Sequence, residues 1–309
     1  IVFEKFADYW DKDKIKIDRI VYLPLVDATV RLANLKSGGL DLIERLLATD
    51  IKAVQSDPKL KLSSAIELGY QGITLNVGKD KNKGPLSQSA KVRQALDLSI
   101  DRDAINQVVF NGEFKTGNQW LNPDHPYYQK AFPVRGRDID KAKALLKEAG
   151  VTTPVTVDFM VPKGAETEAV AQVVQSMASE AGFDMKIRVT EFATSLKQAE
   201  AGEYQAYLLA WSGRIDPDGN AYVFLKSNAP QNYSAWANPE ADKALDDARL
   251  VTDQAKRKAI YEKLTRLELD DNPILYIYHR KILIAHTTRL EGYRQMPDGL
   301  VRVTGLTLK

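Results

Sequence analysis

A regular alternation of strand-like and helix-like segments in the middle of the chain constrains its fold more than any other feature. Apolar segments typical of buried strands alternate there with helical segments: residues 155–161, 165–181, 185–189, 195–201 and 204–210. Strands that are joined through helices of this length pair in parallel, because the chain must cross back over the sheet before each new strand begins. The pattern therefore predicts an α/β fold with a mainly parallel sheet and helices on its faces.

The last strand of this alternation leads into a short polar loop, residues 211–219 (WSGRIDPDG), and then into an apolar segment at 221–225. Open α/β sheets bind ligands where strands end and helices begin. An ordinary strand–helix connection also fits, with Asp216 as the N-cap and Pro217 at the first helical position. A cap accounts for Asp216 and Pro217 but not for Trp211 beside Arg214, so we expect the loop to bind a ligand as well.

The composition is that of a globular protein without a charge bias. Of 309 residues, 44% are hydrophobic and 27% are charged, and 43 basic residues nearly balance 41 acidic ones. This balance gives no indication of binding to nucleic acid or to an anionic membrane. No apolar run reaches the length of a membrane span. The absence of cysteine rules out disulfides and thiolate metal sites, and it suits an exported protein.

Changes of pattern along the chain predict three parts. Strand-like segments come first, at residues 1–6, 15–25, 60–66 and 72–77. A polar segment at residues 78–89 then marks a domain boundary, and helical and alternating patterns follow it. Pro273 ends the last long helix, and residues 274–278 and 282–285 resemble strands that return to the first sheet. The predicted parts are residues 1–77, 78–272 and 273–309.

Catalytic and metal-binding signatures are not found in the sequence. His125, His279 and His286 are the only histidines, and none belongs to a two-histidine helical motif. No nucleophile elbow, phosphate-binding loop or dinucleotide fingerprint occurs, and no cofactor is predicted. Asp216 and Asp218 are the best candidates for a pair of catalytic carboxylates, but a role in the turn and the cap accounts for them more simply.

Three stretches together resemble the periplasmic solute-binding proteins of ABC importers, in the peptide- and nickel-binding class. Residues 86–109 (LSQSAKVRQALDLSIDRDAINQVV) resemble a signature of that family, and residues 138–150 resemble the helix that follows a proline-rich loop in it. The third stretch is the Trp211 loop, which is similar to the family's W-x-x-x-x-D-P segment. The resemblance runs in collinear order along the whole chain.

The resemblance implies a two-lobed α/β architecture, of the class with an extra domain, in which the lobes close on a solute like a hinge. It implies an extracytoplasmic binding protein, not an enzyme, that delivers its solute to an ABC permease in the inner membrane. It also implies that a signal sequence and the opening of the first lobe precede Ile1. Residues 1–77 would then be part of the first lobe, 78–272 the complete second lobe, and 273–309 the return to the first.

The resemblance also indicates where the solute binds and how this chain departs from peptide binders. Peptide-binding members carry an Asp three residues after the loop Trp, where it pairs with the ligand's α-amino group, and here that residue is Arg214. Residues 165–168, where dipeptide binders use an Arg, are not basic. A guanidinium favours a carboxylate or phosphate over an ammonium group. The candidate ligand-binding residues are Trp211, Ser212, Gly213, Arg214, Asp216, Tyr70 and Trp120.

Three functions remain in competition at this point. The leading one is capture of a small anionic or zwitterionic solute, with Trp211 as a stacking wall and Arg214 as the polar anchor. The second is a hydrolase that uses Asp216 and Asp218, and the third is a structural fragment that binds no ligand. A surface or interdomain salt bridge is the competing role for Arg214.

We predict that residues 1–309 alone do not form a complete functional unit. A first lobe of this family needs a preceding segment to complete its sheet. Without that segment, the side chains of Val2, Phe6, Val21 and Leu23 would be exposed to solvent. Either a separate polypeptide covers that side, or the chain shields it by associating with itself. The chain alone should bind its solute poorly or not at all. Intact-mass analysis and size-exclusion chromatography test this, and a well-behaved monomer with tight solute binding would contradict it.

Overall fold

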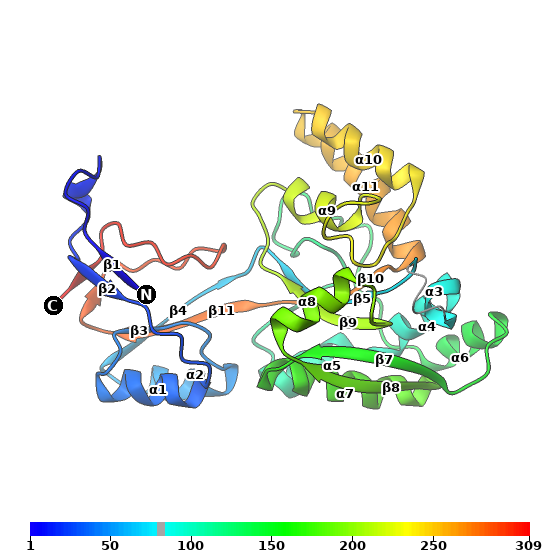
Figure 1. Ribbon diagram of the computed structural model, residues 1–309, viewed down its shortest axis with the longest axis horizontal. Coiled ribbons are helices and arrows are strands. Elements are labelled where there is room, and N and C mark those ends of the chain that lie inside the picture. Colours follow the sequence, from blue (N-terminus) through cyan, green and yellow to red (C-terminus); the bar gives the residue numbers. More distant parts are fainter. Residues whose placement is uncertain (79–83) are drawn as a thin grey trace. The chain divides into compact units, whose positions relative to one another are not determined.

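The computed structural model describes residues 1–78 and 84–309 and divides into two compact units (Figure 1). Unit 1 comprises Ile1–Glu67 and Lys281–Lys309, and unit 2 comprises Leu68–Arg280. Part of the polar segment that the sequence marks as a boundary, residues 79–83, lies outside the described residues. The chain passes between the units at Glu67–Leu68 and again at Arg280–Lys281.

This division differs from the predicted boundaries after residues 77 and 272. Strands β5 (Tyr70–Leu75) and β10 (Ile274–His279), which are predicted to belong to the first lobe, hydrogen-bond to each other within the sheet of unit 2. Their apolar patterns identify them as strands but carry no information about which sheet they join. Pairing between strands some 200 residues apart is a tertiary effect that a local pattern does not encode.

A six-stranded sheet forms the framework of unit 2, in the order β6-β10-β5-β9-β7-β8. The remaining strands are β6 (Lys115–Thr116), β7 (Val155–Pro162), β8 (Phe183–Thr190) and β9 (Ala206–Trp211). The prediction that the three strands of the central alternation share one sheet is confirmed. The sheet is parallel only where β7 pairs with β8 and β9; β5, β10 and β6 join it antiparallel, so the expectation of a mainly parallel sheet is wrong.

Helices with clear start and stop signals pack against this sheet. Helix α7 (Ala165–Ala181) packs on β8 and ends at Gly182, whose φ of 101° suits a residue without a side chain. Helices α4, α5 and α6 pack against α7, as Figure 1 shows. Asp101 and Asp138 cap α5 and α6 by accepting main-chain N–H groups. The bounds of these and the neighbouring short helices are α3 Pro85–Gln88, α4 Ala90–Ser99, α5 Arg102–Phe110, α6 Ile139–Glu148 and α8 Phe192–Glu200.

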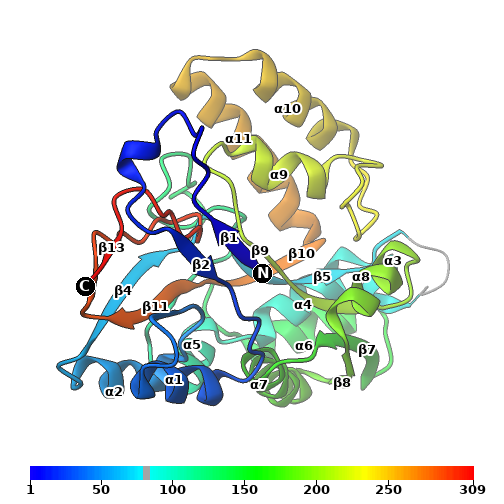
Figure 2. The same cartoon turned by 60° about the vertical axis from the view of Figure 1, so that its left-hand side comes forward.

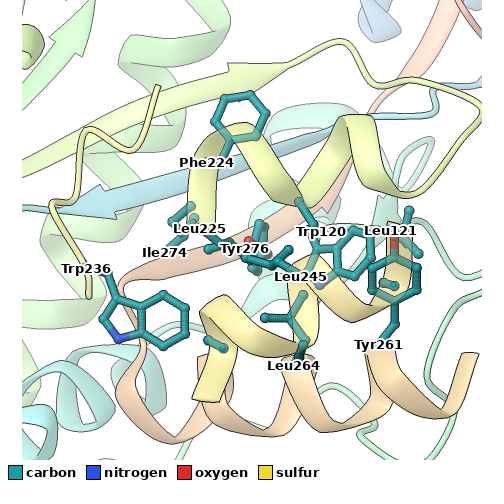
Figure 3. Packing of buried hydrophobic residues seen from close by; sticks show 14 of the residues in the cluster. Trp120, Leu121, Phe224, Leu225, Trp236, Leu245, Tyr261, Leu264, Ile274 and Tyr276 are labelled. Carbon is teal, nitrogen blue, oxygen red and sulfur yellow. The ribbon is translucent and has the colours of Figure 1, made fainter. Parts of the chain in front are cut away.

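A second helical group covers the other end of unit 2. Helices α9 (Asp218–Leu225), α10 (Pro239–Leu250) and α11 (Gln254–Asp271) lie together in both views of the molecule (Figure 2). Figure 3 shows Phe224 and Leu225 of α9, Leu245 of α10, and Tyr261 and Leu264 of α11 in one apolar cluster. Side chains from β10 and from the preceding loops complete that cluster, so it ties the helices to the sheet.

Unit 1 is smaller and is built on three antiparallel strands. Its sheet has the order β3-β11-β4, with β3 Leu42–Ile43, β4 Leu60–Ile66 and β11 Lys281–Thr287. Two two-stranded sheets accompany it, β1 (Val2–Glu4) with β2 (Arg19–Val21), and β12 (Leu290–Glu291) with β13 (Thr307–Leu308). The helices are α1 (Ala28–Ser37), which Asp27 caps, α2 (Ile51–Gln55) and the 3₁₀ turns Lys12–Lys14 and Ala48–Asp50.

The first strands of unit 1 are shorter than the pattern of residues 1–6 and 15–25 predicts. Four apolar side chains on and beside them remain about half exposed or more: Val2 49%, Phe6 66%, Val21 50% and Leu23 51%. Among the described residues, no helix combines the length and the apolar character that crossing a membrane requires.

A buried carboxyl group lies in the interior of unit 2, on α11. Glu268 is fully buried, and neither of its side-chain oxygens has a hydrogen-bond partner in the described structure. Burial, together with the nearby carboxylates of Asp97 and Asp271, raises the pKa of Glu268 well above its ordinary value of 4.5. The group therefore keeps its proton in the folded protein under conditions in which the unfolded chain would lose it.

We predict that Glu268→Gln flattens the dependence of stability on pH. Because the folded pKa is raised, the stability is fully present below the unfolded pKa and falls as the pH rises toward the folded pKa. The amide cannot titrate, so the variant should gain on the wild type as the pH rises from about 4 to 8. Urea unfolding at several pH values measures this, with Glu262→Gln on the same helix as the control. Parallel pH profiles for the wild type and Glu268→Gln would contradict the prediction.

Candidate functional site

The Trp211 loop, residues 211–219, follows the strand at the centre of the unit 2 sheet. Strand β9 lies between β5 and β7, and its last residue, Trp211, pairs with Tyr70 at the start of β5. The chain then turns through the polar loop into α9. Ser212, Arg214 and Asp216 are exposed there, whereas Gly213 and Pro217 are buried. The candidate ligand-binding residues of the loop therefore lie on a surface turn that the central strand supports.

One buried side chain, Asn220 of α9, organises this turn. Its Oδ1 accepts hydrogen bonds from Trp211 Nε1 at 2.9 Å and from the main-chain N–H of Arg214 at 2.6 Å. Its Nδ2 donates to the main-chain oxygen of Arg214 at 2.8 Å. The side chain is 1% exposed, so these bonds are protected from water. Asn220 thereby sets the orientation of the indole ring and the course of the main chain at Arg214.

Close backbone contact holds the other side of the turn. A Cβ atom at Gly69 would overlap the main-chain oxygen of Trp211, and one at Gly213 would overlap the main chain of Leu68 and Gly69. Gly213 also has a φ of 83°, a left-handed conformation that glycine adopts without strain. His279, which is buried on β10, lies beside this contact, and its Nδ1 is 2.7 Å from the main-chain oxygen of Gly69. The turn is therefore fixed by backbone packing as well as by Asn220.

His279 is neutral in this arrangement. Burial lowers the pKa of its imidazole to about 4, so near neutral pH the ring has one N–H, which it donates from Nδ1 to the Gly69 oxygen. This histidine therefore supports the main chain behind the Trp211 loop and is not a surface group.

Trp211 and Arg214 form a stacked pair on the loop. The guanidinium carbon of Arg214 lies 4.4 Å from the centre of the Trp211 ring, within the range of a cation–π contact. The ring packs edge-on against Phe224 at 4.9 Å, and Arg214 Nη1 donates to the main-chain oxygen of Gly213 at 2.7 Å. In the described part of unit 2, no carboxylate forms an ion pair with Arg214. Among the described residues of that unit, its charge is therefore not compensated by a neighbouring acid.

The two aspartates of the loop, by contrast, are paired with arginines from the helical group. Arg257 of α11 donates two hydrogen bonds to Asp216, both 2.9 Å long, and Arg249 of α10 donates two to Asp218, at 2.8 and 2.9 Å. The bond to Arg257 lowers the pKa of Asp216, so this carboxyl is ionised at neutral pH. Sequence reasoning missed both arginines, because nothing in their helical patterns indicates a partner more than 30 residues away.

The helix after the loop begins one residue later than predicted. Helix α9 starts at Asp218, Pro217 precedes it, and no side chain caps it. Asp216 is therefore not its N-cap, although Asp216 Oδ1 accepts the main-chain N–H of Asp218 at 2.9 Å. The same Asp216 Oδ1 also accepts Arg257 Nη2 at 2.9 Å, so one carboxylate serves both the turn and the ion pair.

Tyr70 and Trp120 lie in the interior of unit 2, not on its surface. Their side chains are 4% and 1% exposed and belong to the apolar cluster behind α9. The Trp120 ring packs edge-on against Tyr261 at 5.2 Å (Figure 3), and the Tyr70 ring packs against Tyr276 at 4.7 Å. The structure thus brings together the five candidates of the loop and places Trp120 apart from them, in the core.

A small depression lies at the start of β5, and the Tyr70 side chain forms part of its lining. Its lining includes Tyr70, Leu209, Phe224, Gln231 and Tyr233. Gln231 and Tyr233 come from the connection between α9 and α10, and no sequence pattern singles them out. Phe224 lines this depression and also packs against Trp211, so the depression lies next to the Trp211 loop. Among the described residues, no three His, Asp or Glu side chains are grouped so that they could hold a metal ion.

Comparison with known proteins identifies the class. Residues 1–233 match the model of the bacterial extracellular solute-binding proteins, family 5 (middle region). The chain belongs to this family, as the three sequence stretches and the α/β fold indicate.

Individual relatives extend the match over nearly the whole chain. The "Di/tripeptide-binding protein 1" of Pseudomonas aeruginosa is 30% identical over 97% of this chain, which spans 56% of that protein, about half its length. The structure of AppA from Bacillus subtilis in complex with a nonapeptide is 26% identical, with a TM-score of 0.84 over 94% of this chain and 60% of that one. NikA from Staphylococcus aureus in complex with Ni(L-His)2 shares the fold, with a TM-score of 0.88 and 23% identity over 100% of this chain and 66% of that one.

We predict that Gly213→Ala disrupts the Trp211 loop. The new methyl group would meet the main chain of Leu68 and Gly69, and alanine disfavours a φ of 83°. The left-handed conformation and the overlap together should cost about 2 to 5 kcal/mol of folding free energy. Gly136→Ala is a matched control, since a Cβ there meets nothing within 4 Å. Urea unfolding measures both variants, and equal stabilities would contradict the prediction.

Proposed function

We propose that this chain is the solute-binding part of an extracytoplasmic component of an ABC importer. It captures a small peptide-like, opine-like or other anionic or zwitterionic solute in the periplasm and presents it to a permease in the inner membrane. Membership of the family of extracellular solute-binding proteins supports the class of function. The relatives named above are described as binding proteins or as complexes with a peptide or a metal–amino-acid complex.

The observation that carries the proposal is the state of Arg214. Its guanidinium is exposed, stacks on Trp211 and has no carboxylate partner in the described part of unit 2, while Asn220 fixes its main chain. A fixed guanidinium on an aromatic platform suits a planar anionic group, to which it donates two parallel hydrogen bonds. An ammonium group at the same place would meet repulsion. We therefore propose that the solute's carboxylate, or an equivalent anion, binds at Arg214.

The state of the two aspartates supports binding rather than hydrolysis. A general acid must hold a proton near neutral pH, but the hydrogen bonds from Arg257 lower the pKa of Asp216. Asp218 is likewise engaged at both oxygens by Arg249. Neither carboxylate is arranged as a general acid, so the hydrolase alternative finds no support in this geometry.

Calorimetry with three related probes tests the proposal in the intact protein. The dipeptide Ala-Ala carries both terminal charges, N-acetyl-Ala-Ala carries only the carboxylate, and Ala-Ala-amide carries only the ammonium group. We expect the two carboxylate-bearing probes to bind and the amide to bind more weakly, without turnover of any of them. Binding of the amide as tight as that of Ala-Ala would contradict the role of Arg214, and cleavage of a probe would favour the hydrolase.

We predict that Arg214→Ala weakens binding of the carboxylate-bearing probes by about 2 to 4 kcal/mol, the usual cost of removing one partner of a desolvated charge pair. Arg214→Lys should recover only part of this loss, because an ammonium group cannot make the planar two-bond contact. Affinities for the three probes, measured in both variants, check the prediction. Unchanged affinity in both would assign Arg214 to an ordinary surface role.

A further inference from the structure

Two arginines outside the Trp211 loop change the charge that the loop presents. Between Trp211 and Gly219 the loop contains Arg214, Asp216 and Asp218, which gives it a formal charge of −1. Arg257 and Arg249 each neutralise one of these aspartates through two hydrogen bonds. With both ion pairs included, the local charge becomes +1, and it resides on Arg214.

Other contacts hold the two arginines in place, so each pair is preorganised. Arg257 Nε donates to the main-chain oxygen of Ala248 at 2.8 Å, and the side chain is only 14% exposed. The guanidinium of Arg249 lies 3.4 Å from the centre of the Tyr222 ring. Bidentate ion pairs that other contacts hold in place are more stable than ordinary surface ion pairs, which water and salt weaken.

The main chain of the loop does not depend on these ion pairs. Asn220 holds Trp211 and Arg214, and the backbone contact between Gly69 and Gly213 holds the turn from the other side. Arg257 therefore affects the loop surface mainly through its charge. Without Arg257, the Asp216 carboxylate would lie two residues from Arg214 with its charge unpaired. It could then attract the Arg214 guanidinium or the ammonium group of a solute.

We propose that Arg257 is a specificity-determining residue: it withholds the Asp216 carboxylate from the solute, and Arg249 does the same for Asp218. The loop thereby selects an anionic group, although its own sequence carries more acidic than basic residues. This inference deepens the proposed function and rests on it for the identity of the solute class. The charge of the loop itself is measurable without any solute.

The first experiment reads the charge beside Trp211 by fluorescence quenching, in intact protein that carries Trp10→Phe. Trp10 is 84% exposed, whereas Trp120 and Trp236 are buried, so in the variant Trp211 is the most accessible of the three tryptophans that remain in this chain. Iodide should quench Trp211 better than caesium does. In Arg257→Met the ratio of the iodide to the caesium quenching constant should fall roughly twofold to fivefold at low salt, the effect of one unit charge at short range in water.

A double variant separates charge from position. Asp216→Asn combined with Arg257→Met removes both members of the pair, so it restores the charge balance without restoring the contact. We expect it to return the quenching ratio to the wild-type value. Lys243→Met is the matched control, because it removes a positive charge from an exposed pair with Asp247 on α10 and should leave the ratio unchanged.

The second experiment measures the preference for N-acetyl-Ala-Ala over Ala-Ala-amide in the same variants. Arg257→Met should reduce this preference about as much as it reduces the quenching ratio, and the double variant should restore it. A quenching ratio that does not move in Arg257→Met, or that stays low in the double variant, overturns the proposal, since Arg257 would then act only through structure. If the wild type binds neither probe, the proposed function fails for peptides, while the quenching result still decides the role of Arg257.

Discussion

The antiparallel pairing of β5 with β9 is the interaction on which the rest of unit 2 depends. It joins the parallel strands β9, β7 and β8 to the antiparallel strands β10 and β6 in a single sheet. The same register sets Tyr70 opposite Trp211 and brings Gly69 into contact with Gly213. A slip of one residue would turn every side chain of β9 to the opposite face and separate Trp211 from Phe224. The geometry of the loop is therefore a consequence of strand register.

Local signals predicted the elements of this fold well and their partners poorly. Asp27, Asp101 and Asp138 cap helices, and a local pattern can encode such a cap because it is a contact within four residues of the chain. The sheet is mixed, contrary to expectation, since β5 and β10 enter it from distant parts of the chain. Strand pairing depends on contacts between such distant segments, and hydrophobic periodicity identifies a strand without naming its neighbour.

Some residues of the candidate site could likewise be recognised from the sequence, and others could not. Trp211 and Arg214 stand out in the sequence because the start of a helix requires neither an indole nor a guanidinium. Asn220, which orients both, reads as an ordinary helical residue until its three hydrogen bonds are seen. Trp120 differs, since nothing in the composition of its loop indicates that its side chain lies in the apolar cluster of unit 2. Burial is decided by packing, which loop composition does not reveal.

The charge of the Trp211 loop is likewise a property of the fold and not of the segment alone. One arginine and two aspartates give the Trp211 loop a negative formal charge, and from composition alone it would attract a cation. Arg249 and Arg257 reverse that sign only because α10 and α11 pack beside α9. Helix packing thus leaves Arg214 as the charged side chain of the loop that has no acidic partner in the described part of unit 2. In a family whose members bind different solutes, changes on such neighbouring helices offer a route to new charge selectivity that leaves the loop sequence intact.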